Sequence, residues 1–284
     1  MIKINYKVKK LLYDVIFYFL IINLVAVCLF VPFVSLITSF QNDTEVLSIP
    51  AKFIPRPPRF INYINLWKET SLLINIKNGL IVTLSSIGLV LLISMLAAFA
   101  LSSLYIPGKE FFMLLLLFTQ MFSPVVILLP LFKLFKILNL LDSLLGLILV
   151  NSTFCLAFST LLFKAFFDTI PNDIIEASLI DGCNKFQSII KIILPISAPG
   201  IFVVTVYIFT QVWNEFLFAF TFIFSTEKYT PIVGLFSLIQ TPFIKLPPWN
   251  LAMAFSIVIS IPVIILFYLR KSDMVEGLAA GAIK

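Results

Sequence analysis

Residues 170–200 read IPNDIIEASLIDGCNKFQSIIKIILPISAPG, a polar stretch between long apolar segments. Lipid does not tolerate such a segment on its own, because every backbone N–H and C=O group needs a partner there. We therefore expect the stretch to lie in water or against another protein. Its residues predict two short amphipathic helices separated by sharp turns, an arrangement suited to a docking surface.

The first of these helices is predicted to begin near Pro171 and to end at Gly182. Proline is favourable in the first turn of a helix, where its missing N–H costs little. Asn172 and Asp173 favour a helix N-terminus as caps and through the helix dipole. Gly182 suits the left-handed position that follows a helix end. The pattern predicts a helix, a glycine corner and then another helix.

The second helix is predicted to begin near Asn184 and to be stopped by Pro195. Its apolar side chains follow the i, i+3, i+4, i+7 spacing of one helix face. These side chains are Phe186, Ile189, Ile190 and Ile193. Pro199 and Gly200 then redirect the chain into the next apolar segment.

Six apolar segments are long enough to cross a membrane. Hydrophobic residues make up 61% of the 284, charged residues 12%, and the mean hydropathy is +1.09, which does not fit a soluble surface. Crossing a hydrocarbon core of about 30 Å takes about 20 helical residues. The predicted spans are residues 12–36, 80–104, 111–135, 144–167, 201–224 and 251–269. Pro124 and Pro130 interrupt the third span, although neighbouring helices can compensate for such breaks.

The basic residues predict that both chain termini lie in the cytoplasm. Four lysines and no acidic residue stand in residues 1–10, before the first span, and basic segments favour the cytoplasmic side. Six spans return the chain to that side, so residues 170–200 and the tail at 270–284 are also expected there. The first apolar run is too long for a cleaved signal peptide and offers no small-residue cleavage site.

The composition argues against several other classes of protein. The chain has no histidine and three widely spaced cysteines, Cys28, Cys155 and Cys183. A zinc site, a haem histidine ligand and a Ser-His-Asp triad are therefore not expected. No GxxxxGK[ST] sequence is present, so the chain is not expected to hydrolyse ATP. The net charge of +6 forms no single basic face, so nucleic-acid binding is not predicted.

The polar stretch resembles the cytoplasmic EAA loop of bacterial ATP-binding-cassette (ABC) importer permeases. The residues that carry this likeness are Glu176, Ala177, Ser178, Asp181, Gly182, Leu194, Pro195, Pro199 and Gly200. Ser178 and Cys183 stand where alanine or another small residue is usual. Residues 211–216, QVWNEF, are similar to the QxWNEF pattern of carbohydrate-uptake permeases. Residues 277–284, GLAAGAIK, are similar to the GLxAGAxK tail of the shorter permease in maltose-type systems.

This resemblance implies an all-α fold, the MetI-like fold of ABC importer permeases, with six transmembrane helices and cytoplasmic termini. The chain would then be one transmembrane permease domain, residues 1–284, in the lipid bilayer of the cell membrane. Its parts would be a first span at about 12–36, core spans at about 80–269, a coupling loop at about 168–200 and a tail at 270–284.

The resemblance also implies partners. A second homologous permease completes the pathway, a dimer of ABC ATPase subunits binds ATP and Mg²⁺, and an extracytoplasmic binding protein delivers the sugar. The chain itself is then not an enzyme and needs no cofactor. Contact with the ATPase is expected at Glu176, Ala177, Ser178, Asp181, Gly182, Leu194 and Pro195. Gly277 and Gly281 of the tail are expected to reach the ATPase as well.

Four residues of the fifth span are candidates for the substrate pathway, namely Gln211, Trp213, Asn214 and Glu215. Polar groups at membrane depth are costly and tend to face the bundle interior or a cavity. An aromatic ring beside amide and carboxylate groups suits a sugar, although the same groups could hold helices together by hydrogen bonds. For the polar residues of other spans we favour packing over substrate contact; they are Asn75, Asn78, Gln120 and Asn151.

Other functions stay open on these observations. A secondary transporter driven by protons or sodium could use Glu215 as its proton carrier, although one acid without a histidine provides few groups for proton transfer. A membrane-embedded enzyme would need a nucleophile, a metal-ligand set or a cofactor motif, and the sequence shows none. For an ABC importer, glycerol phosphate or a polyol is the alternative cargo. No lysine or arginine lies clearly inside a span, which favours a neutral sugar.

Overall fold

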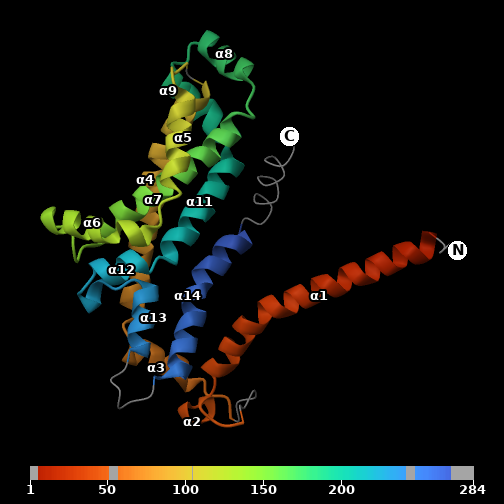
Figure 1. Ribbon diagram of the computed structural model, residues 1–284, viewed down its shortest axis with the longest axis vertical. Coiled ribbons are helices and arrows are strands. Elements are labelled where there is room, and N and C mark those ends of the chain that lie inside the picture. Colours follow the sequence, from red (N-terminus) through yellow and green to blue (C-terminus); the bar gives the residue numbers. More distant parts are fainter. Residues whose placement is uncertain (1–5, 51–56, 104, 241–246, 270–284) are drawn as a thin grey trace. The chain divides into compact units, whose positions relative to one another are not determined.

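The computed structural model describes residues 6–50, 57–103, 105–240 and 247–269. Every regular element in these residues is a helix, as expected for an all-α membrane protein (Figure 1). The chain forms two compact units, one of Met1–Thr70 with Ser237–Ser260 and the other of Ser71–Phe236 with Ile261–Lys284. The expectation of one transmembrane domain over the whole chain stays a prediction.

The first unit begins with one long apolar helix. Its helices before residue 70 are α1 (Tyr6–Ser39), α2 (Asp43–Val46) and α3 (Ile61–Glu69). Residues Tyr13–Ser39 are long and apolar enough to cross a membrane, in agreement with the first predicted span. The Asn62 amide donates to the carbonyl oxygens of Ser39 and Gln41, at 2.8 and 2.9 Å. These bonds tie α3 to the end of α1.

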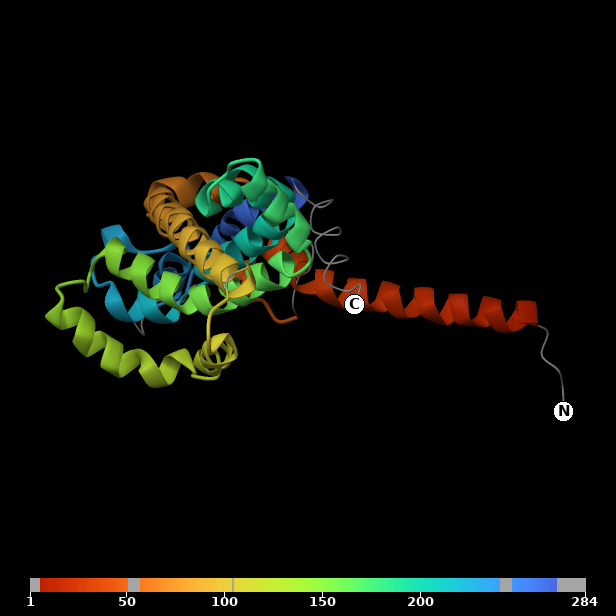
Figure 2. The same ribbon diagram turned by 90° about the horizontal axis from the view of Figure 1, so that it is seen from above.

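The core of the second unit is a bundle of three helices. They are α4 (Leu72–Ser103), α7 (Leu144–Phe167) and α11 (Ala198–Trp213). Each packs against the other two, and Figure 2 shows them side by side. Val90, Phe163 and Ile208, one from each helix, are fully buried. Small polar side chains such as those of Ser86 and Ser159 also lie buried in this bundle, where they let helices approach closely.

The third predicted span is bent. It forms α5 (Lys109–Thr119) and α6 (Pro124–Ile137), which meet at 94°. The predicted interruption is present directly before Pro124, which lies in the first turn of α6, where its missing N–H costs little. Pro130 lies inside α6 and does not end it. Four described helices are long enough to span a membrane alone, and up to six spans result if each bent pair counts as one.

The polar stretch forms a series of short helical pieces. They are α8 (Asn172–Ile180), α9 (Lys185–Ser188), a π-helical turn (Ile189–Ile193) and α10 (Leu194–Ile196). The chain then bends by 75° at Ser197 into α11. The prediction that Pro195 stops the second helix is wrong, because Pro195 lies inside α10. The Leu194 N–H bonds to the Ile189 carbonyl five residues earlier, so the helix has already left the i→i−4 pattern where proline would break it.

The fifth predicted span, residues 201–224, is also interrupted. Helix α11 ends at Trp213, and a separate short helix follows after three residues without helix structure. The remaining elements are α12 (Leu217–Phe222), the 3-10 turn η2 (Thr226–Lys228), α13 (Pro231–Ile239) and α14 (Trp249–Leu269). Helix α14 corresponds to the sixth predicted span.

Candidate functional site

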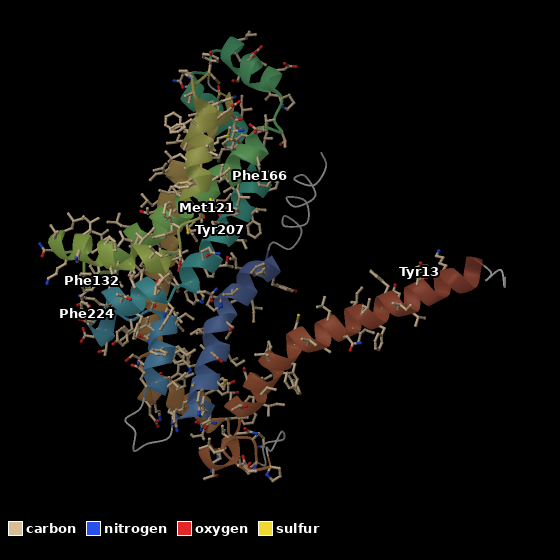
Figure 3. The ribbon with its side chains drawn as sticks, viewed as in Figure 1. Tyr13, Met121, Phe132, Phe166, Tyr207 and Phe224 are labelled. Atoms are coloured by element: carbon tan, nitrogen blue, oxygen red, sulfur yellow. The ribbon has the colours of Figure 1, made fainter. Side chains whose placement is uncertain are left out.

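A pocket of about 660 Å³ lies between α5, α6, α7, α11 and α12 of the second unit. Its polar lining consists of Thr119, Gln120, Asn151, Thr153, Gln211 and Glu215. Its aromatic lining consists of Phe122, Phe154, Tyr207, Phe216 and Phe218. Tyr207 projects from α11 and is labelled in Figure 3. A cavity of this size, apolar with a few convergent polar groups, is the usual form of a small-molecule site.

The break between α11 and α12 places Glu215 in the wall of this pocket. Phe216 occupies the N-cap position of α12 and has no side-chain acceptor for the first N–H groups of that helix. Glu215 supplies the acceptors instead. Its Oε1 accepts the Phe218 N–H at 2.6 Å, and its Oε2 accepts the Ala219 N–H at 3.0 Å. Both carboxylate oxygens therefore stabilise the start of α12.

The four predicted pathway residues fall into two pairs. Gln211 and Glu215 line the pocket, whereas Trp213 and Asn214 lie outside its lining. Trp213 is buried and stacks on the neighbouring Phe209, with ring centroids 5.5 Å apart. The Asn214 amide donates at 2.8 Å to a carbonyl oxygen in the last turn of α11. The QVWNEF segment thus combines pocket lining, helix packing and the ending of a helix.

Two residues that the sequence assigned to packing also line the pocket, namely Gln120 and Asn151. Gln120 stands at the turn between α5 and α6, where the two prolines of this span indicated an interruption but not a bend of 94°. Asn78 matches its predicted packing role, because its amide donates to the Glu227 and Tyr229 carbonyl oxygens at 2.8 and 3.1 Å. These bonds tie α4 to the segment around η2.

A polar cluster around Asp142 was not predicted. One carboxylate oxygen of Asp142 accepts the backbone N–H groups of Phe224 and Ser225, at 3.0 and 2.9 Å. The other accepts the Ser225 hydroxyl at 2.5 Å and the Lys228 ammonium at 3.0 Å. The cluster joins the turn before α7 to the segment after α12. Its members are far apart in the sequence and follow no spacing motif, so no local signal identifies them.

The cluster also sets the charge state of Asp142, which lies outside the membrane-spanning segments. Partial burial alone would raise the pKa of its carboxyl group. Hydrogen bonds from Ser225, Lys228 and Phe224 outweigh this effect and hold the pKa well below its usual value. Asp142 is therefore a carboxylate at neutral pH and forms an ion pair with Lys228.

Gly182 forms the predicted corner after α8. Its φ is +86°, in the left-handed region where a residue with a Cβ is strained. The Cys183 N–H donates to the Ser178 carbonyl at 3.0 Å and closes this turn. Ser178 is buried, and its Oγ lies 2.6 Å from the Oγ of buried Ser188. The third residue of the EAA-like sequence thus holds the two arms of the corner together.

The start of the second arm agrees with the prediction. The Asn184 N–H donates to the Gln187 Oε1 at 3.0 Å, and the Gln187 N–H donates to the Asn184 Oδ1 at 2.8 Å. This reciprocal pair is a capping box, which satisfies N–H groups that a helix start leaves without partners. Local bonds thus define both the corner and the start of the second arm.

The outward face of the corner presents groups for contact with another molecule. Glu176, Ala177 and Asp181 are exposed. Ile180 exposes 86% of its surface beside them. An exposed aliphatic side chain bordered by acidic groups has the apolar centre and polar rim that are typical of protein contacts.

The base of the polar stretch is anchored to α7. A Cβ at Gly200 would lie 2.7 Å from the ring carbon Cγ of Phe166, which is labelled in Figure 3. Glycine therefore lets the start of α11 pack directly on this ring. At the end of α7, Asp168 accepts the Ser102 hydroxyl at 2.8 Å and pairs with Lys164 at 2.6 Å.

The remaining predicted coupling residues are less constrained by these observations. Leu194 is half-buried and Pro195 is exposed, both in α10. Gly277 and Gly281 of the tail lie outside the described residues, so their predicted contact with an ATPase stays a prediction.

Together, the fold and the pocket define a polytopic helical membrane protein with a pocket among its helices and a polar loop between two of them. Residues 90–271 match the family of binding-protein-dependent transport system inner membrane components. The chain is 34% identical to the sulfoquinovosyl glycerol transport system permease protein SmoH of Agrobacterium fabrum, over 88% of this chain and 86% of that protein.

Two further comparisons give the same result. The chain is 31% identical to the trehalose/maltose transport system permease protein MalG of Thermococcus litoralis, over 91% of this chain and 92% of that protein. Its fold matches a chain in the crystal structure of a bacterial ABC transporter involved in the import of the acidic polysaccharide alginate. That match has a TM-score of 0.81 at 22% identity and covers 95% of this chain and 99% of the other.

The chain therefore belongs to the family of binding-protein-dependent transport system inner membrane components. It is a multi-pass inner-membrane permease of a binding-protein-dependent ABC importer, and it is not itself an enzyme. These comparisons confirm the predicted family, the all-α permease fold and the membrane location.

Proposed function

We propose that this chain forms part of the translocation pathway for a carbohydrate. We also propose that residues 168–200, the coupling loop, transmit to it the conformational change that ATP hydrolysis drives in the ATPase subunits. The observation that carries the proposal is the pocket, because amide groups from three separate elements converge there with aromatic rings. Amides pair with sugar hydroxyl groups, and rings cover the apolar faces of a sugar.

Relatives support a carbohydrate as the cargo. SmoH is named for sulfoquinovosyl glycerol, and MalG of Thermococcus litoralis for trehalose and maltose. A further relative, SugB of Mycobacterium tuberculosis, is named for trehalose and is 30% identical over 82% of this chain. Glycerol phosphate or a polyol is the alternative cargo for the same kind of transporter.

The shape of the coupling loop supports its proposed role. Ser178 and Ser188 hold its two arms together, and Gly182 fixes the angle between them. The contact of Gly200 with Phe166 joins its base to α7, whose residues also line the pocket. A rigid corner held in a cleft of an ATPase subunit would therefore move α7 and α11 together, which is the type of motion that switches a packed bundle between two states.

We propose the corresponding partners on the same grounds. A second homologous permease completes the pathway, and an extracytoplasmic binding protein delivers the sugar. A dimer of ATPase subunits holds ATP and Mg²⁺ and contacts the exposed residues Glu176, Ala177 and Asp181. This arrangement requires both termini of the chain and the coupling loop to lie in the cytoplasm.

The test is transport by the purified complex of both permeases and the ATPase in proteoliposomes, with the binding protein added outside. Uptake of radiolabelled sugar should require ATP inside and should not follow an imposed proton gradient. Uptake that follows the gradient without ATP would instead indicate an ion-coupled secondary transporter. Uptake of glycerol phosphate or a polyol in preference to every sugar would change the cargo and leave the ABC mechanism intact.

A further inference from the structure

We propose that the pocket lining of this chain favours an uncharged sugar over sugars that carry a carboxylate, a sulfonate or a phosphate, in contrast to the sulfonated sugar for which the relative SmoH is named. This inference rests on the proposed carbohydrate function and adds the chemical class of the cargo. It follows from which charged groups line the pocket and from what those groups are bonded to.

The pocket wall offers no counter-charge to an anion. None of the described residues that line it is a lysine or an arginine. The one carboxylic acid among the described lining residues, Glu215, directs both side-chain oxygens at the backbone N–H groups of Phe218 and Ala219. An anion held against this wall would gain no ionic partner from this chain, while mainly apolar side chains would displace part of its water, which is costly. Arginine and lysine are the side chains that proteins commonly use to bind carboxylate or phosphate groups.

The same wall suits a ligand that is rich in hydroxyl groups. Gln120, Asn151 and Gln211 bring neutral amides from the α5–α6 turn, α7 and α11. Gln120 and Gln211 are exposed, so their amides are open to a ligand. Phe154 and Tyr207 add aromatic rings from two of these helices. Amides act as both donors and acceptors, as sugar hydroxyl groups do, so each can pair without any net charge.

The test measures sugar binding to the purified complex of both permeases and the ATPase without the binding protein, so that the binding protein's own selectivity does not enter. Saturation-transfer NMR detects the weak binding expected of a transport pocket. The probes are maltose, trehalose and glucose as neutral sugars, and glucuronate and glucose 6-phosphate as anionic ones. We expect signals from at least one neutral sugar and none above background from the anions.

Two matched variants place the binding in the pocket. The Asn151 amide donates to the carbonyl one turn earlier at 2.9 Å, and the exposed Asn23 of α1 makes the same bond at 2.8 Å. Asn151→Ala should weaken neutral-sugar binding by about 10-fold, since a lost hydrogen bond is worth roughly that factor. Asn23→Ala loses the same back-bond outside the pocket and should leave binding unchanged.

A charge-gain variant tests the selectivity directly. Gln211→Arg supplies a cation at an exposed lining position and should give a new signal for glucuronate or glucose 6-phosphate. Co-elution with the ATPase confirms that each variant is folded. Anion binding by the unaltered complex equal to that of neutral sugars overturns this inference and leaves carbohydrate import intact. If no sugar of either kind binds or is transported, the proposed carbohydrate function fails as well.

Discussion

The Glu215 carboxylate accepts the backbone N–H of Phe218 at 2.6 Å, and this contact sets where α12 begins. Phe218 is buried, and its ring lies 5.1 Å from that of Phe154 on α7. The same contact therefore fixes an aromatic wall of the pocket. A residue that the sequence suggested as a pathway contact or proton carrier is, in the structure, first of all a residue that starts a helix.

Replacing Glu215 separates these roles. Glu215→Ala removes both acceptors of the α12 start and should cost about 1–2 kcal/mol, the usual loss for a helix cap. Glu215→Gln keeps one acceptor oxygen and nearly the same shape, so its melting temperature should lie between those of Glu215→Ala and the unaltered complex. Thermal unfolding and ATP-dependent uptake measure both effects. A proton carrier would instead make Glu215→Gln as inactive in transport as Glu215→Ala, although more stable.

Gly182→Pro should uncouple ATP hydrolysis from transport. Proline fixes φ near −65°, whereas Gly182 has φ of +86°, so the corner after α8 cannot form. The measurement is stimulation of ATP hydrolysis by the loaded binding protein in proteoliposomes, which we expect to be lost. Asp181→Lys reverses the charge of an exposed residue beside the corner and should have the same effect with a smaller change in stability.

Gly108 provides a matched control for the backbone effect. It also has a positive φ, +78°, and neither glycine has a neighbour within 4 Å of a Cβ placed on it. Gly108→Ala and Gly182→Ala should therefore carry a similar strain, about 1 kcal/mol. Only the change at Gly182 should lower the stimulation of ATP hydrolysis. An equal loss of coupling in Gly108→Ala would show that general strain, and not the coupling loop, is responsible.

The corner at Gly182 could be predicted from the sequence because every signal that forms it is local. A proline, caps and a glycine within a dozen residues each act on the adjacent backbone, and the structure forms the helix and the turn where they indicate. The error at Pro195 arose because the prediction assumed regular α-helical bonds up to the proline. The π-helical turn before it depends on bonds across five residues, which the apolar spacing alone does not reveal.

The pocket could be predicted only in part. QVWNEF marked a polar site in the fifth span, and two of its residues do line the pocket. Gln120 was assigned to packing like other lone polar residues of the spans, because the prolines of the third span indicate a break but not its angle of 94°. Asp142 binds residues more than 80 positions later, so its role was not visible in a single sequence.

The Asp142 cluster should make stability depend on pH in a defined direction. Its pKa is lower in the folded protein than the usual value of about 3.9 for an unfolded chain. The carboxylate therefore stabilises the fold at pH values above about 4, and this contribution is lost as pH falls towards the folded pKa. Asp142→Asn should lower the melting temperature at pH 7, and its difference from the unaltered complex should shrink below about pH 4.

The control variant is Asp181→Asn, because Asp181 is an exposed acid outside the membrane-spanning segments. It should show little loss of stability at pH 7. Lys228→Met removes the ion pair with Asp142 and should reproduce part of the Asp142→Asn effect at pH 7. A constant difference between Asp142→Asn and the unaltered complex from pH 7 to pH 3 would contradict the assigned role of the carboxylate.

A single methyl group on one face of α4 should destabilise the second unit. A Cβ at Gly79 would lie 2.5 Å from the Pro231 Cδ and 3.2 Å from the Trp213 ring carbon Cζ3, so Gly79→Ala must move α13 or the indole. Overpacking of this kind costs about 1–3 kcal/mol.

Gly88 lies on the same helix with nothing within 4 Å of its Cβ position. Gly88→Ala should therefore be neutral or slightly stabilising, because alanine favours a helix over glycine by about 1 kcal/mol. Melting temperatures of the two variants in the purified complex measure the contrast, and equal values would mean that α4 and α13 do not pack this closely.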